Sequence, residues 1–93
     1  MNDSLYSIVL EYRGGTYISQ ISAMNQNAAL TAWASSLSET ELSAWKMNKT
    51  VLLKIVEGDI PIALEGCFNA WCLSGNIDGS LALINVFKTA KSR

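Results

Sequence analysis

The sequence predicts an α+β fold of two layers, in which an antiparallel sheet of about five strands has helices on one face. Each end of the chain predicts a β-hairpin, because Gly14-Gly15 and Asp78-Gly79 interrupt runs of alternating apolar and polar residues. Both dipeptides favour the positive φ angles of a type I′ turn, which joins adjacent antiparallel strands. Apolar residues at helical spacing fill the middle of the chain. The expected order is β-β-α-α-β-β-β.

The bulk properties indicate one domain over residues 1–93, because a chain of this length supports a single hydrophobic core. Charged residues make up only 16% of the chain, below the usual share of about 25%, and hydrophobic residues make up 49%. We therefore expect some apolar surface to lie in an interface. The net charge of −1 argues against nucleic-acid binding, which normally needs a basic face.

Neither end of the chain nor any run within it indicates export or membrane insertion. The first residues have no basic segment before an apolar run, and no apolar run reaches the roughly 18 residues of a membrane helix. We therefore expect a cytoplasmic protein with no membrane partner.

The first hairpin begins with a strand over residues 5–13, where side chains alternate with period two. With Gly14-Gly15 as the turn, Tyr12 is expected to pair with Tyr17 and so to place one mostly apolar face against the core. The opposite face is half polar and is expected to face water or a partner; it carries Ser7, Val9, Glu11, Ile18, Gln20 and Ser22.

The middle of the chain predicts two helices followed by a strand. Side chains at 25–27 can cap a helix over 28–37, and Ser38 with Glu41 forms a capping box for a second helix that ends near Met47. Residues 49–57 are rich in β-branched side chains and too few for a confident helix, which favours a third strand. Pro61 interrupts that strand, and residues 61–66 form a connection or a short edge strand.

The second hairpin joins strands over 68–77 and 80–89. Pairing about Asp78-Gly79 places Trp71 opposite Val86 on a core face. The other face is too apolar for water and too polar for a core, so it is the candidate interface; its residues are Ala70, Cys72, Leu81, Leu83, Asn85 and Phe87. A second copy related by a two-fold axis is the simplest cover, which predicts a homodimer.

Nothing in the chain indicates catalysis, and we expect no enzyme, no cofactor and no metal. Histidine is absent, so the usual base for a nucleophile and a common zinc ligand are missing. Cys67 and Cys72 lie five residues apart in the predicted strand and so point to opposite faces, which disfavours a disulfide.

An alternative is a small-molecule binder or minor enzyme with a pocket between helices and sheet. Trp33, Trp45 and Trp71 would line that pocket together with the tyrosines, although aromatic residues among apolar neighbours more often belong to a core. A concave site with convergent polar groups would favour this alternative, and a flat, partly apolar surface would favour protein interaction.

One resemblance supports the interaction hypothesis. The run from Tyr6 to Ile21, which includes Gly14-Gly15, is followed by Asn27-Ala28-Ala29-Leu30-Thr31-Ala32-Trp33. Over this first third, the chain resembles the hairpin and helix of HicB-type antitoxin domains, without the proline-glycine-cysteine segment before the helix. The resemblance implies a small bacterial module that contacts another protein. The function that we expect is therefore a protein-interaction module, antitoxin-like, immunity-like or an accessory subunit.

Overall fold

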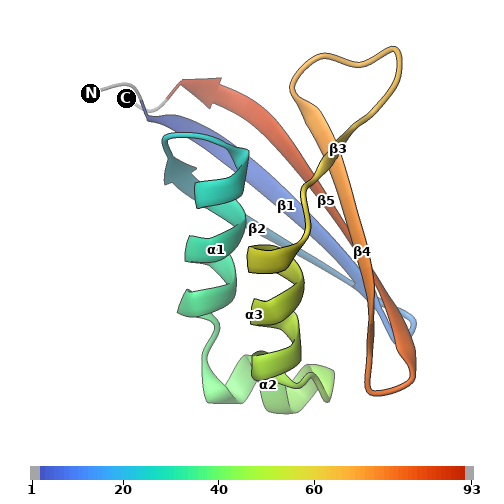
Figure 1. Ribbon diagram of the computed structural model, residues 1–93. Helices are drawn as coiled ribbons and strands as arrows, with labels where there is room; N and C mark the ends of the chain where they lie inside the picture. The colour runs from blue at the N-terminus through green and yellow to red at the C-terminus, as the bar shows by residue number, and fades with distance from the viewer. Residues whose placement is uncertain (1–2, 92–93) are drawn as a thin grey trace.

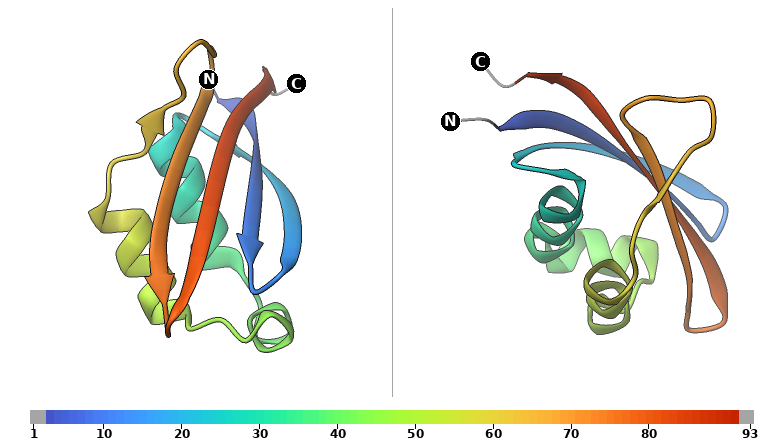
Figure 2. Two further views of the ribbon diagram at one scale, coloured as in Figure 1. Left: turned by 90° about the vertical axis from the view of Figure 1, so that its right-hand side faces the viewer. Right: turned by 45° about the horizontal axis from the view of Figure 1, so that its top comes forward.

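The computed structural model describes residues 3–91 as a five-stranded antiparallel sheet with three helices on one face (Figures 1 and 2). The α+β fold of two layers is confirmed. The elements in chain order are β1 (Ser4–Tyr12), β2 (Gly15–Ala23), α1 (Gln26–Ser36), α2 (Glu39–Trp45), α3 (Lys49–Gly58), β3 (Ile62–Ala63), β4 (Ala70–Ile77) and β5 (Ser80–Lys91).

The sheet has the order β2-β1-β5-β4-β3, so the first and last long strands pair at its centre. Ile8 of β1 lies opposite Val86 of β5, and Leu10 lies opposite Ile84; all four side chains are fully buried. Helices α1 and α3 pack side by side below these strands. The core therefore lies between the middle of the sheet and the helical layer.

The first hairpin turns one residue earlier than the sequence predicts. Its turn is Arg13-Gly14, with φ angles of 49° and 79°, and Tyr12 pairs with Gly15. The predicted pairing of Tyr12 with Tyr17 is wrong, since Tyr17 pairs with Leu10. Gly15 is the first residue of β2, and a Cβ there would overlap the hydroxyl of Tyr17. The register differs by two residues, so every side chain keeps its predicted face.

Helix α1 begins at Gln26, two residues before the predicted start, and α2 begins where its capping box predicts. The side chain of Asn25 accepts from the backbone N–H of Ala28, and Ser38 and Glu41 form both hydrogen bonds of the capping box. Helix α1 buries its predicted apolar stripe, which consists of Ala29, Leu30, Trp33 and the following Leu37. Helix α2 ends at Lys46, which has the left-handed conformation.

Residues 49–58 form helix α3, so the strand predicted there is wrong. The side chain of Asn48 accepts from the N–H of Val51 and caps the helix. Leu52 and Val56 lie one turn apart and are buried, while Lys54 points to solvent. This spacing is helical, and the β-branched content that suggested a strand is overridden by packing. The third strand along the chain is instead the short β3, within residues 61–66, where the sequence predicts a connection or a short edge strand.

The second hairpin has the predicted register throughout, including Trp71 opposite Val86. Asp78 and Gly79 have φ angles of 50° and 87°, as a type I′ turn requires, and the side chain of Asn76 accepts from the N–H of Gly79. Strand β4 begins at Ala70, so Cys67 lies in the loop before it. The prediction that Cys67 and Cys72 share one strand is therefore wrong.

Candidate interaction surface

The face of the sheet that points away from the helices carries no other element of the described chain (Figure 2, left). We call it the outer face. It combines the outward positions of five strands: Leu5, Ser7, Val9, Glu11, Thr16, Ile18, Gln20, Ser22, Ile62, Ala70, Cys72, Ser74, Asn76, Leu81, Leu83, Asn85, Phe87 and Thr89.

All six residues of the candidate interface lie on the outer face, on β4 and β5. The pairing of β1 with β5 extends this surface across the first hairpin, because Val9 lies opposite Asn85 and Glu11 lies opposite Leu83. Sequence reasoning described the two half-polar faces separately. No sequence signal joins them, because their union depends on the strand order.

The outer face is apolar in its middle and nearly free of charge. Ile18 and Leu81 are 69% and 58% exposed, and Leu83, Phe87 and Val9 are half-buried between their neighbours. Among its described strand positions, the only ionisable carboxylate or ammonium belongs to Glu11. A charge-poor centre with aliphatic and aromatic side chains is typical of the core of a protein interface.

One end of the outer face holds a small polar network. The hydroxyls of Ser7 and Thr89 lie 2.9 Å apart, and Gln20 Nε2 donates to Ser7 Oγ at 3.0 Å. Thr89 also donates to the backbone oxygen of Leu5 at 3.1 Å, next to a shift in the β1–β5 register. These side chains satisfy one another, so this end of the surface is organised before any partner binds.

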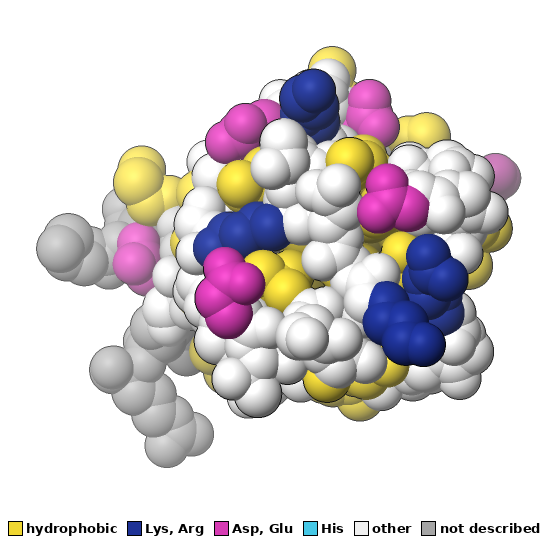
Figure 3. Space-filling model, turned by 90° about the horizontal axis from the view of Figure 1, so that it is seen from below, with side chains coloured by type: hydrophobic (Ala, Val, Ile, Leu, Met, Phe, Trp, Pro, Cys, Tyr) yellow, Lys and Arg dark blue, Asp and Glu magenta, His cyan; other side chains and the backbone are white. Residues whose placement is uncertain are grey.

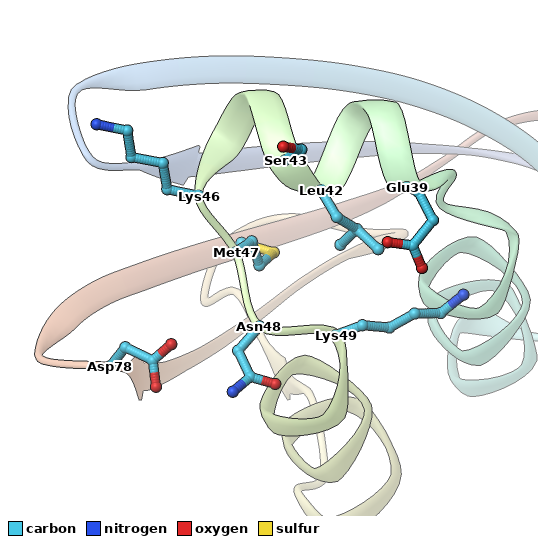
Figure 4. Close-up of a pocket in the computed structure, with 8 residues that line it drawn as sticks. All are labelled: Glu39, Leu42, Ser43, Lys46, Met47, Asn48, Lys49 and Asp78. Carbon is cyan, nitrogen blue, oxygen red and sulfur yellow. The ribbon is translucent and has the colours of Figure 1, made fainter.

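The largest of the four described hollows, of about 510 Å³, is shallow and lies between α2 and the start of α3; Figure 4 shows its lining residues. Its lining is Glu39, Leu42, Ser43, Lys46, Met47, Asn48, Lys49 and Asp78. Lys49 Nζ donates to the backbone oxygens of Ser35 and Leu37, at 3.0 and 3.3 Å, and so binds the end of α1. Lys46 points away from the hollow.

This end of the molecule shows no concentration of one charge. Basic and acidic side chains alternate around exposed apolar atoms in Figure 3. Asn48, like Lys49, is already engaged, since its Oδ1 caps α3. Two polar groups of the hollow, Asn48 and Lys49, therefore stabilise the ends of helices, which gives little support to a ligand site here.

The tryptophans do not gather around one pocket. Trp33 is 3% exposed within the core, and Trp45 stacks on Tyr17 with ring centroids 4.5 Å apart. Trp71 lies 6.4 Å from the ring of Tyr6 at the other end of the sheet. None of the four hollows described on the surface is lined by a tryptophan.

Titratable groups give no further site in the described residues. Burial raises the pKa of the Tyr6 hydroxyl above its ordinary value of 10.0. Within residues 3–91, no group of three acidic or cysteine side chains is arranged to hold a metal ion. Over the same residues, no helix has the length and apolarity needed to cross a membrane.

No protein-family model, no curated protein and no solved structure matches the chain. The resemblance to HicB-type domains stays a prediction from the sequence.

Proposed function

We propose that this chain is a cytoplasmic protein-interaction module that binds a protein partner through its outer face. An antitoxin-like, immunity-like or accessory role fits this activity, and the bacterial resemblance in the first third agrees with it. The partner is either a second copy of the chain or a different protein. The supporting observation is an uncovered sheet face with exposed Ile18 and Leu81 and, among its described positions, a single charged side chain, Glu11.

The alternative of a small-molecule site receives less support from the geometry. The tryptophans expected to line such a site pack in the core or against tyrosines. The largest of the described hollows is shallow, and one of its two lysines, Lys49, is bound to the end of α1. A ligand site of drug-like size normally encloses most of its ligand, with polar groups that converge on it.

Affinity capture from the native cell, followed by mass spectrometry, tests the proposal when three forms of the chain are compared. Leu83→Lys places a charge at the centre of the outer face. Ala44→Lys places the same charge at an exposed position of α2, in the helical layer, and is the matched control. We expect to capture a partner with the unmodified chain and with Ala44→Lys. The same partner should be absent from the Leu83→Lys sample.

Folding must be checked before a loss of binding is assigned to the surface. Leu83 is half-buried and its neighbour Ile84 is fully buried. Leu83→Lys should therefore fold, since the long side chain can extend to water, whereas Ile84→Lys should not. A partner that binds folded Leu83→Lys as well as the unmodified chain would contradict the proposal.

A further inference from the structure

We infer that the β2 edge of the sheet joins the β2 edge of a second copy of this chain, so that one antiparallel sheet continues through both copies. This inference concerns the side of the sheet and goes beyond the proposed function of the outer face. It places self-association at β2 and not at the second hairpin, where the sequence predicts it, and so leaves the outer face to a different protein.

Within the described residues, β2 is the strand at one end of the sheet, and its only strand neighbour is β1. It pairs with β1 from Gly15 to Ala23 and has no strand beyond it (Figure 2, left). Its closing pair is Tyr12 with Gly15, and residues of such a ladder alternate between inward and outward hydrogen bonding. The N–H and C=O groups of Thr16, Ile18 and Gln20 therefore point to the open edge.

The β2 edge lacks the features that normally prevent strand addition. Proteins usually protect edge strands with charged side chains, proline, bulges or short length. Strand β2 has nine residues, a regular register with β1, no proline and no charged residue. Ile18, in its middle, is 69% exposed.

The other edge of the same sheet is interrupted, because β3 pairs only with Trp71 and Cys72 of β4. Strand β3 has two residues, and Pro61, which precedes it, has no N–H to donate. Asp59 and Ile60 continue along that side and line a hollow with Ser74 of β4. The contrast between the two edges singles out β2 as the longer and more regular edge for pairing.

A second copy fits the β2 edge better than a charged partner does. Residues 14–38, which comprise β2 and α1, contain no charged side chain, and α1 contacts β2. Two copies therefore approach along this side without repulsion between like charges, while a charged partner would find no opposite charge. A two-fold axis beside Ile18 and Gln20 makes the strands antiparallel, and the outward groups of each copy then meet those of the other.

The test combines sedimentation equilibrium with amide hydrogen exchange of the intact chain. We expect a dimer with a dissociation constant below about 1 mM. In the dimer the amides of Ile18 and Gln20 should exchange slowly, and their exchange should become faster when dilution produces the monomer. The amide of Ser19, which points toward Ile8, should stay slow at both concentrations. A chain that stays monomeric to about 1 mM, or a dimer in which the two edge amides exchange fast, would overturn the inference.

A matched pair of variants tests the same edge. Ile18→Pro removes an outward N–H and keeps the β1–β2 ladder, and Ile18→Ala shortens the same side chain but keeps that N–H. We expect Ile18→Pro to be monomeric where Ile18→Ala and Leu83→Lys are dimeric. If Leu83→Lys is monomeric and Ile18→Pro remains dimeric, the hypothesis of pairing at the β2 edge is rejected. Self-association would then be assigned to the outer face. If Ile18→Pro does not fold, the amide hydrogen exchange of Ile18 and Gln20 in the unmodified chain tests the inference instead.

Discussion

At the scale of single residues, Gly15 occupies a position where the ring of Tyr17 leaves no space for a side chain. A Cβ at this position would overlap the Tyr17 hydroxyl and lie 2.6 Å from its Cζ. The Tyr17 ring is held in place by its stack on Trp45, with centroids 4.5 Å apart. The glycine is therefore required for space beside the ring, whereas Gly14 supplies the positive φ of the turn.

We expect Gly15→Val to lower the free energy of unfolding by about 1 to 3 kcal/mol, because the ring of Tyr17 must leave its stack. Denaturant unfolding measures this change. Thr16→Val is the matched control, since Thr16 is exposed and the change should stay within about 0.5 kcal/mol. Equal midpoints for the two variants would show that Tyr17 moves without cost.

The buried hydroxyl of Tyr6 predicts a loss of stability in alkali. Because burial raises its pKa in the folded protein above 10.0, the unfolded chain releases this proton first as the pH rises. The contribution of the protonated Tyr6 hydroxyl to the free energy of unfolding is intact below about pH 10. It is lost as the pH rises through the folded-state pKa. Denaturant unfolding should show a smaller alkaline loss for Tyr6→Phe than for the unmodified chain. Parallel curves for the two proteins would contradict this assignment.

At the scale of elements, α3 shows where local pattern loses to packing. Val51, Ile55 and Val56 have side chains that favour strands, yet Leu52 and Val56 are buried one turn apart. The helical cap at Asn48 is visible in the sequence and is the signal that was missed. The caps of α1 and α2 were recognised, and both helices were predicted correctly. The Asp78-Gly79 turn fixed the second hairpin because only one dipeptide there suits a type I′ turn, whereas two overlapping dipeptides compete at 13–15.

The packing of α3 on β4 depends on Gly75. A Cβ at Gly75 would lie 2.5 Å from Cδ1 and 2.9 Å from Cγ1 of Ile55. We expect Gly75→Val to lower the free energy of unfolding by about 1 to 3 kcal/mol. In a double-mutant cycle, Ile55→Ala should relieve part of that loss, because it removes the atoms that clash. Additive losses would place the strain elsewhere than between α3 and β4.

At the scale of the whole molecule, the pairing of β1 with β5 decides the surface. The sequence predicts both hairpins and their faces, but which strand of one hairpin meets which strand of the other depends on long-range packing. This pairing joins Val9 and Glu11 to Asn85 and Leu83, and leaves β2 at an edge. The six candidate interface residues were predictable because one hairpin contains them. The outward positions of the first hairpin were predictable as a separate face, but their union with the second hairpin and the position of β2 at an edge were not.

The most direct measurement of the outer face uses the two thiols of the unmodified chain. Cys72 lies on the outer face opposite Asn85, while Cys67 is exposed in the loop before β4 and serves as the internal control. The protein is alkylated sparsely in living cells and, separately, as a dilute purified sample. Mass spectrometry then gives the ratio of Cys72 labelling to Cys67 labelling in each sample. We predict a lower ratio in cells, because a partner covers Cys72 and leaves Cys67 free. The same ratio in both samples would contradict a protein partner on the outer face.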